Sequence, residues 1–349
     1  MKNFEVFSNP RKIYVRMLKD IRAAKKEILL ETYIYDDDKI GKKFRDELIK
    51  KALEGVKVRL LVDAWGSDAD KKFFKKFIEA GGKVRFFREI RYVIRFFNEN
   101  HERNHRKLLL IDNKISYIGS INITGDCLNW RELVLRLEDD ITYSLKRTFV
   151  RSWYNFNKLI NRRLKKIFHE DYEIIQDSPL KLFRPAERSY KKLIRKAKKE
   201  VFIETPYFVP SSGVRRAIRK AVKRGVEVKI IIPHSSDLRF LDIFRNRYIG
   251  RLHKKGVKIY FYSKVLHSKL LIIDDLFFLL GSSNLDFRSF RHQYEINLLG
   301  KDRKIICDLK EYFKQTLKGS HAFDYAKWKH RHIFKRIIEV LMKPFGRYL

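Results

Sequence analysis

The chain has 349 residues, of which 44% are hydrophobic and 14% aromatic, and its charged residues are spread along the whole length. This composition excludes intrinsic disorder, and the length allows one large domain or two of ordinary size. The 79 Lys and Arg residues outnumber the 42 Asp and Glu residues, which gives a formal net charge of +37. Such an excess attracts nucleic acid or anionic lipid surfaces, unless it is simply a solvated surface rich in Lys, Arg and Glu.

Cys127 and Cys307 stand far apart and outside any metal-ligand spacing, so we expect neither a disulfide framework nor a cysteine–metal site. The amino-terminal residues lack the apolar run of a signal peptide, and no run of about 18 uncharged apolar residues occurs. We therefore expect a protein that is soluble or lies on a membrane surface. The acidic run at residues 36–38 is interpreted as the start of a helix rather than as a calcium site, and we predict no metal.

The predicted elements recur in the same order in the two halves of the chain. Each half contains a basic amphipathic segment, an apolar run that ends in Glu-Thr, a second amphipathic stretch and two further apolar runs. The corresponding segments are 21–28 and 194–201, 29–32 and 202–205, 54–62 and 224–232, and 83–87 and 257–261. An internal repeat of this kind organises the whole chain.

Helix-period segments that alternate with short β-branched runs are typical of βαβ units. Gly55 and Gly225 stand where a helix ends and a strand begins, which is a common position for glycine. Buried strands of this kind need helices on both faces. We predict an α/β protein of two similar α/β/α lobes related by a pseudo-twofold, with the active site at their interface. The predicted regions are a first lobe (1–170), a second lobe (171–320) and a basic amphipathic carboxy-terminal helix (321–349).

The residues that carry chemistry follow the third apolar run of each half. Both copies contain His-x-Lys followed by Asp, then Gly-Ser-x-Asn and a later Glu, at nearly equal spacing. They are His105, Lys107, Asp112, Ser120, Asn122 and Glu132 in the first copy, and His267, Lys269, Asp274, Ser282, Asn284 and Glu295 in the second. One such match is weak, whereas two at equivalent places in a repeat are a strong signal.

Residues two apart on a strand point the same way, so each His should share a face with its Lys, and each Ser with its Asn. Two facing lobes would then surround one phosphate. The lysines would supply positive charge, and the serines and asparagines would donate hydrogen bonds. One neutral imidazole could attack phosphorus while the other transfers a proton, each oriented by Glu132 or Glu295. Asp112 and Asp274 end their strands and are interpreted as ion-pair or turn residues.

The duplicated pattern resembles the phospholipase D superfamily, and the flanking segments resemble bacterial cardiolipin synthases over nearly the whole chain. The flanking likeness lies in residues 31–35, 55–63, 103–107, 129–132, 204–210 and 281–289. It implies a two-step phosphatidyl transfer through phosphohistidine, without metal or other cofactor, that converts two phosphatidylglycerols into cardiolipin and glycerol. It also implies that His105 is the nucleophile and His267 the acid and base. Many members begin with two membrane-spanning helices, so this chain resembles the shorter type.

Two segments could attach the protein to an anionic phospholipid membrane, which we expect to be peripheral attachment on the cytoplasmic side. One lies before His105 and contains Arg91, Arg95, Phe96 and Phe97. The other is the carboxy-terminal helix with Trp328, Phe334 and Arg336, a basic amphipathic pattern that suits a lipid interface. The alternative for the first segment is a strand or helix edge packed on the core, and for the second a terminal helix packed on the core with a solvated basic face.

Two other functions are compatible with the same residues. A nuclease or phosphodiesterase could use the same chemistry, and the positive charge suits a nucleic-acid backbone. A binding protein on a decayed enzyme scaffold is disfavoured, because no position of the duplicated set is lost. We therefore expect phosphatidylglycerol or a related lipid as the substrate and no obligate nucleic-acid partner. The sequence leaves the oligomeric state open.

Overall fold

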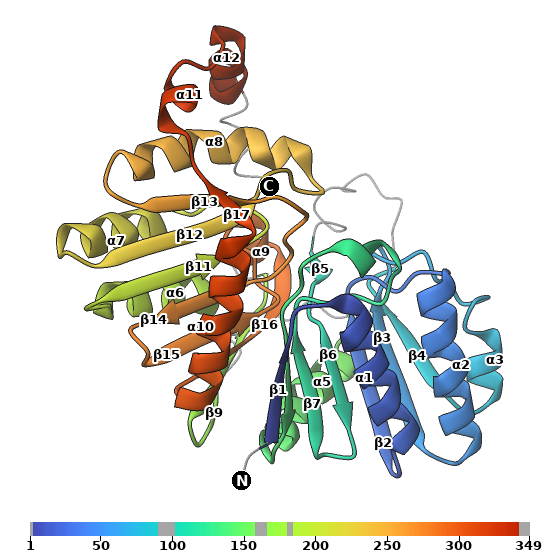
Figure 1. Ribbon diagram of the computed structural model, residues 1–349. Coiled ribbons are helices and arrows are strands. Elements are labelled where there is room, and N and C mark those ends of the chain that lie inside the picture. The colour runs from blue at the N-terminus through green and yellow to red at the C-terminus, as the bar shows by residue number, and fades with distance from the viewer. Residues whose placement is uncertain (1–2, 90–101, 158–165, 180–183, 342–349) are drawn as a thin grey trace.

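The computed structural model describes residues 3–89, 102–157, 166–179 and 184–341. Within them the chain forms two lobes, each built on one mixed β-sheet with helices on both sides (Figure 1). The amino-terminal half forms one lobe and the carboxy-terminal half the other, which confirms the predicted pair of α/β/α lobes.

The first sheet is built from strands of the amino-terminal half. They are β1 (Asn3–Phe7), β2 (Glu27–Thr32), β3 (Lys57–Asp63), β4 (Lys83–Phe87), β6 (Leu108–Ile111), β7 (Ile115–Gly119) and β8 (Val134–Glu138). Their order across the sheet is β1-β8-β7-β6-β2-β3-β4. β2, β3 and β4 run parallel, as predicted βαβ units do, whereas β6, β7 and β8 form an antiparallel meander that joins β2 through β6.

The second sheet repeats this arrangement. Its strands are β9 (Ile167–His169), β10 (Tyr172–Asp177), β11 (Glu200–Glu204), β12 (Glu227–Pro233), β13 (Lys258–Tyr262), β14 (Leu270–Ile273), β15 (Phe277–Gly281), β16 (Gln293–Gly300) and β17 (Ser320–Ala322). The order β10-β16-β15-β14-β11-β12-β13 matches the whole first sheet position by position, with β9 and β17 added at the two edges. The repeat in the sequence is therefore a repeat in topology.

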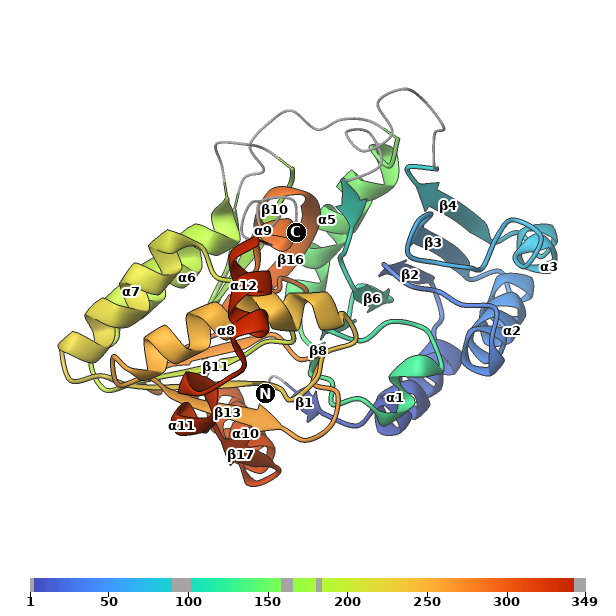
Figure 2. The ribbon, with the colours of Figure 1, turned by 90° about the horizontal axis from the view of Figure 1, so that it is seen from above.

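Helices cover both faces of each sheet. They are α1 (Pro10–Ala23), α2 (Lys39–Leu53), α3 (Lys75–Glu79), the 3₁₀ turn η1 (Asp126–Asn129), α5 (Ile141–Tyr154), α6 (Pro185–Lys196), α7 (Ser212–Lys223), α8 (Arg239–His253), α9 (Phe287–Arg291), α10 (Arg303–Lys318), α11 (Tyr325–Lys329) and α12 (Ile333–Leu341). One core packs α1, α2 and α3 on the first sheet, and another packs α6, α7 and α8 on the second. Seen from above, α6 and α7 lie at one side of the molecule and α2 and α3 at the opposite side (Figure 2).

Local sequence explains where these helices begin and end. The Asn9 side chain accepts from the backbone N–H groups that open α1, and Asp38 does the same for α2. Asp38 therefore acts as the expected acidic helix start. Gly55 and Gly225 follow α2 and α7 with φ of +82° and +84°, a conformation that glycine adopts without steric cost.

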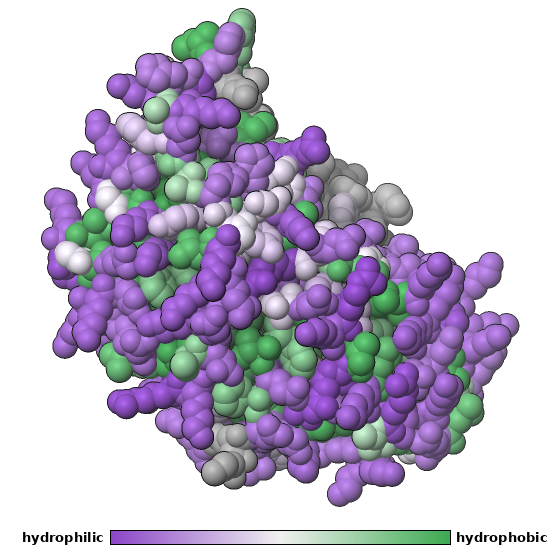
Figure 3. Space-filling model, in the orientation of Figure 1, coloured by the Kyte–Doolittle hydropathy of each residue, from purple (hydrophilic) through white to green (hydrophobic). Residues whose placement is uncertain are grey.

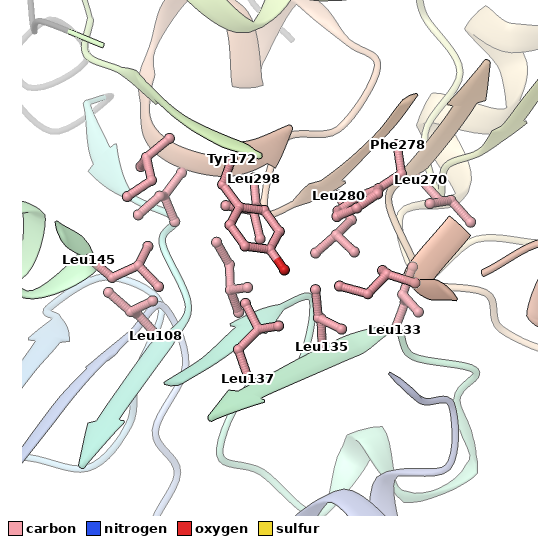
Figure 4. Close-up of a cluster of buried hydrophobic side chains, with 14 of the residues drawn as sticks. Leu108, Leu133, Leu135, Leu137, Leu145, Tyr172, Leu270, Phe278, Leu280 and Leu298 are labelled. Carbon is pink, nitrogen blue, oxygen red and sulfur yellow. The ribbon is translucent and has the colours of Figure 1, made fainter. Parts of the chain in front are cut away.

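A third core lies between the lobes and joins them. Leucine side chains from β6 and β8 meet side chains of β14, β15 and β16, with α5 and α10 packed at its sides (Figure 4). Leu135, Leu137 and Leu298 are among its fully buried members. Because the inner faces of both sheets bury apolar area away from water here, the two lobes stabilise each other.

The lobe boundaries differ from the predicted positions by a few residues. β9 pairs with β10 in a hairpin of the second sheet, so the second lobe begins before position 171. The carboxy-terminal region is also not one helix, because β17 adds to the edge of the second sheet and α11 and α12 form two short helices. Within residues 3–341, gaps at 90–101, 158–165 and 180–183 excepted, no helix is both long and apolar enough to cross a membrane.

Candidate active site

Strand pairing between the lobes brings the two histidine segments together. The short strand β5 (Arg103–Asn104) of the first half pairs in parallel with β16 of the second, and the His105 N–H donates to Tyr294 O at 3.0 Å. The second half mirrors this: Arg131 and Leu266 form a parallel bridge, and the His267 N–H donates to Arg131 O at 2.8 Å. Each histidine is thereby placed against the segment of the other lobe that carries a glutamate.

The two histidine–glutamate pairs are therefore crossed. Nδ1 of His105 lies 3.1 Å from Oε1 of Glu295, and Nδ1 of His267 lies 2.9 Å from Oε1 of Glu132. All four side chains are buried. A carboxylate at Nδ1 holds the proton on that nitrogen and leaves the Nε2 lone pair for chemistry.

Ser120 and Ser282 support these glutamates. The Ser120 hydroxyl donates to Oε2 of Glu132, and the Ser282 hydroxyl donates to Oε2 of Glu295. Each hydroxyl oxygen also accepts from a backbone N–H, from Leu133 at 2.9 Å and from Ile296 at 3.0 Å. The predicted role of these serines was donation to phosphate. Ser120 and Ser282 directly follow β7 and β15, next to β8 and β16, and there each hydroxyl donates its hydrogen bond to the neighbouring glutamate carboxylate instead.

The two lysine side chains contact the backbone of the histidines. Nζ of Lys107 donates to His105 O at 2.8 Å, and Nζ of Lys269 donates to His267 O at 2.7 Å. Burial lowers the pKa of Lys107 to about 7 and that of Lys269 to about 8, with Lys269 adding to the effect on Lys107. Because the charge of Lys269 disfavours the charge of Lys107, a bound anion would stabilise the charged form of both side chains.

Asn122 and Asn284 lie two residues after Ser120 and Ser282, beyond the ends of β7 and β15. Oδ1 of Asn122 accepts from the Ile34 N–H at 3.3 Å. Oδ1 of Asn284 is buried and has no hydrogen-bond partner within the described residues. Both side chains are almost fully buried, so any polar group that they bind must be buried as well.

The two histidines differ in their electrostatic surroundings. Burial lowers the pKa of both imidazoles. For His267 the charge of the Glu132 carboxylate opposes the effect of burial. Burial alone would raise the pKa of Glu132, but His267, Lys269 and the Ser120 hydroxyl together outweigh it and hold the pKa of that carboxyl below its usual range. For His105 the cations Lys107, Lys269 and His267 lower the pKa further, while burial raises the pKa of Glu295 to about 8. A charged imidazole is therefore better supported at His267 than at His105.

Asp112 and Asp274 lie in turns away from the histidines. Both have positive φ, 53° and 52°, as in the two-residue turns that connect tight hairpins. The Asp112 carboxylate accepts from the backbone N–H groups of residues 25–27 at 2.7 to 2.9 Å. Asp274 accepts from those of residues 198–200 at 2.6 to 2.8 Å. Both aspartates thus hold the start of a central strand against the hairpin.

Several residues around the histidines were not identified from the sequence. Arg103 and Asp63 form a fully buried ion pair at 2.8 Å, and Asp63 also accepts from the Asn104 N–H at 2.7 Å, which fixes the segment before His105. The Tyr33 ring contacts His105 at 5.0 Å between centroids, and the Trp130 ring contacts His267 at 5.3 Å. The sequence feature that could have identified Asp63 is its position as a charged residue at the end of a strongly apolar run.

The residues predicted to bind the membrane are only partly described. Arg91, Arg95, Phe96 and Phe97 lie outside the described residues, and the side chain of Arg336 on α12 is not described either. The Trp328 ring packs on Gly250 of α8, and its Nε1–H donates to Asn246 O at 2.9 Å, so this residue anchors α11. Phe334 is 66% exposed. Its helix α12 lies at the tip of the second lobe (Figure 1), where Figure 3 shows hydrophobic residues above a largely hydrophilic face.

No group of three His, Cys, Asp or Glu side chains arranged to hold a metal ion occurs in the parts of the chain that the structure describes. In the active site each glutamate carboxylate contacts a histidine and a serine hydroxyl. The positive charge for a phosphate is available from Lys107 and Lys269.

Two topologically equivalent lobes that each contribute one His-x-Lys segment to a shared buried site define a phospholipase D-like fold. The family model described as "Cardiolipin synthase, PLD-like domain" matches residues 17–153 and 190–317. The chain belongs to this family, as the sequence analysis predicted from the flanking segments.

Similar proteins agree with this assignment. The "Major cardiolipin synthase ClsA" of Bacillus subtilis (strain 168) is 34% identical over 352 residues, which cover 96% of this chain and 73% of that protein. A cardiolipin synthase of Clostridium perfringens (strain SM101 / Type A) is 32% identical over 363 residues, 98% of this chain and 76% of that protein. The crystal structure of phosphatidylserine synthase from Haemophilus influenzae Rd KW20 shares the fold, with a TM-score of 0.80 at 15% identity over 99% of this chain and 93% of that chain.

Proposed function

We propose that the protein is a cardiolipin synthase that transfers a phosphatidyl group from one phosphatidylglycerol to another and releases glycerol. The observation that carries this proposal is the crossed pairing of His105 with Glu295 and of His267 with Glu132, which places two oriented imidazoles and two lysines in one buried site. The relatives at 31 to 34% identity that carry the name cardiolipin synthase support the lipid substrate.

The first step is an attack on phosphorus by Nε2 of His105, with the Nδ1–H held by Glu295. The new P–N bond forms as the P–O bond to glycerol breaks, and protonated His267 gives its proton to the departing oxygen. In the second step the terminal hydroxyl of another phosphatidylglycerol loses its proton to His267 and attacks phosphorus. The P–N bond breaks, and cardiolipin leaves with His105 restored.

The difference between the two pairs supports this division of roles. A nucleophilic imidazole must be uncharged, and burial together with Lys107 and Lys269 disfavours charge at His105. A proton carrier must accept and release charge, and the low pKa of Glu132 provides a persistent counter-ion for His267. Both pairs consist of a histidine and a glutamate, so their different roles must come from the charges and burial around each pair.

Charge stabilisation is assigned to Lys107 and Lys269, with the amide groups of Asn122 and Asn284 as hydrogen-bond donors to the phosphate. Their burial excludes water, which strengthens each electrostatic contact in the transition state. The chemistry then needs no metal.

Attachment to the membrane is assigned to the tip of the second lobe and is expected to be peripheral, on the cytoplasmic side. Ile333, Phe334, Ile337 and Leu341 on α12 are 44 to 66% exposed, which is unusual for large apolar side chains grouped on one short helix. A helix of this kind can lie in the lipid interface with its apolar side chains among the acyl chains.

The direct test incubates the purified protein with phosphatidylglycerol vesicles and measures cardiolipin and glycerol. We expect both products in equal amounts from the wild-type protein and neither from His105→Ala. The outcome that would overturn the proposal is intact lipid together with cleavage of single-stranded DNA by the same preparation.

A further inference from the structure

A cavity of about 520 Å³ between α7 and α8 has a strongly basic lining. Helix α7 contributes Arg215, Arg216 and Arg219, and α8 contributes Arg247 and Arg251, with two lysines that follow α8. The cavity lies on the outer helix layer of the second lobe, and none of the crossed histidine–glutamate residues lines it. It is therefore separate from the active site.

The arginines of this cavity have no acidic partner in the described part of the chain. Within the ranges that the structure describes, none of these five arginines forms an ion pair with a carboxylate. Arg215 and Arg219 stand one helical turn apart, as do Arg247 and Arg251, and like charges at that spacing destabilise a helix. Burial, together with Arg219, Arg247 and Arg251, lowers the pKa of Arg215. A bound anion would relieve this repulsion.

Arg215 is held in place before any ligand arrives. Its guanidinium lies 4.5 Å from the centre of the Tyr248 ring, and its Nη1–H donates to Pro210 O. The side chain therefore loses little conformational freedom when it contacts an anion, and this favours affinity. Arginine also suits phosphate oxygens because its planar N–H donors can contact two of them at once.

The cavity shares helix α8 with the exposed apolar tip. Trp328 of α11 packs on Gly250 and donates to Asn246 O, and α12 also contacts α8. Arg247 and Arg251 are the residues that directly follow these two contact positions along α8. A basic cavity and exposed apolar side chains supported by one helix suit a ligand with a charged headgroup and apolar chains better than a free phosphate.

We propose that this arginine cavity is a non-catalytic binding site for the phosphate headgroup of an anionic phospholipid that carries more than one negative charge. The proposal rests on the membrane attachment in the proposed function, since the headgroup would be bound while α12 lies in the interface. Several unpaired arginines are more than a singly charged phosphodiester requires, whereas a phosphomonoester offers about two charges and three acceptor oxygens. The site would then distinguish lipids by headgroup charge, independently of the substrate in the active site.

The test measures binding of the full chain to phosphatidylcholine vesicles that contain either phosphatidate or phosphatidylglycerol, at mole fractions that match their surface charge. We expect the wild-type protein to bind the phosphatidate vesicles about tenfold more tightly. The variant R219Q/R247Q/R251Q should lose this preference. The matched control R303Q/K304Q/K314Q removes three exposed charges from α10 and should weaken binding to both vesicles equally.

Two further measurements separate the outcomes. Thermal unfolding of R219Q/R247Q/R251Q should occur at the wild-type temperature or above it, because repulsion is removed, and cardiolipin formation in detergent micelles should be unchanged. Equal binding of the wild-type protein to the two charge-matched vesicles would overturn the proposal. If only soluble pyrophosphate binds in an arginine-dependent manner, the lipid assignment is wrong. If the wild-type protein forms no cardiolipin but still prefers the phosphatidate vesicles, only the proposed function is overturned.

Discussion

The carboxylate of Glu295 lies 3.1 Å from Nδ1 of His105, although the two residues are 190 positions apart and belong to different lobes. The same relationship joins Glu132 to His267 over 135 positions. Each histidine therefore depends on the other half of the repeat for its tautomer. Neither half contains a complete acid–base pair of its own.

This crossing predicts that the two glutamates affect different steps. With a phosphatidyl p-nitrophenyl ester the leaving group departs without a proton, so the first step does not need His267. Glu132→Gln should then release a burst of p-nitrophenol at close to the wild-type rate, followed by turnover slowed about 10²–10⁴-fold. Glu295→Gln should show no burst, because His105 lacks the carboxylate that holds its proton on Nδ1.

Stopped-flow absorbance measures the burst, and His267→Ala and His105→Ala serve as the corresponding histidine controls. A burst in Glu295→Gln that is missing in Glu132→Gln would mean that the roles of the two pairs are reversed. Equal effects on both steps would contradict the separate assignment.

The lowered pKa values of the two lysines predict an unusual pH dependence of phosphodiester binding. An ammonium group is charged below its pKa, and those of Lys107 and Lys269 lie at about 7 and about 8. Glycerophosphoglycerol, which keeps one negative charge from about pH 5 to 10, should bind best below pH 7 and weaken as pH rises through this window. Calorimetric titration in wild type and Lys107→Met checks this. Constant affinity up to about pH 10 would show that the lysines are unperturbed.

Asp112 and Asp274 are expected to affect stability and not chemistry. Each carboxylate accepts three backbone N–H groups, and removing it leaves those donors without a partner. Asp274→Ala should lower the free energy of unfolding by about 1–3 kcal/mol in urea titrations. The kcat of the folded protein should stay within about threefold of wild type, because Asp274 has no contact with either imidazole. A loss of kcat with unchanged stability would place the aspartate in the chemistry.

Activity is expected to survive chelation. If Lys107 and Lys269 supply the charge for the phosphate, then EDTA should leave the rate of cardiolipin formation unchanged. Loss of activity on chelation, with recovery on addition of one divalent metal, would contradict the assignment of charge stabilisation to the lysines.

Membrane attachment through α12 predicts that acidic residues there weaken vesicle binding. Phe334 and Leu341 are both 66% exposed, and a charged side chain at either position would have to enter the interface. Phe334→Asp/Leu341→Asp should lower binding to anionic vesicles by about tenfold or more in sedimentation assays. Leu53→Asp on α2, where the leucine is 71% exposed, is the matched control and should have little effect. Equal losses in both variants would point to charge alone.

The fold could be read from the sequence because the repeat made each element visible twice. The run at 54–62 covers most of β3, which pairs in parallel with β2, and the run at 224–232 covers most of β12, which pairs in parallel with β11. Asp112 and Asp274 lie in turns, as their positions after apolar runs indicated. The carboxy-terminal region was less accessible, since its amphipathic pattern fits one long helix as well as the two short helices α11 and α12.

The crossed pairing could not be read from the sequence. Glu132 and Glu295 stand at similar distances after His105 and His267, and spacing alone cannot tell whether a carboxylate serves its own half or the other. Inter-lobe strand pairing, between β5 and β16 and between Arg131 and Leu266, decides this. The spacing within a motif reflects local geometry, whereas the carboxylate partner of each imidazole depends on how segments of the two lobes pair with each other.

The most direct test of the mechanism is to locate the covalent intermediate. His267→Ala, mixed with the phosphatidyl p-nitrophenyl ester and quenched within the burst, should carry one phosphatidyl group per chain. Peptide mapping by mass spectrometry should place it on His105. A phosphatidyl group on any other residue, or a burst of p-nitrophenol without a covalent adduct, would contradict the proposed mechanism.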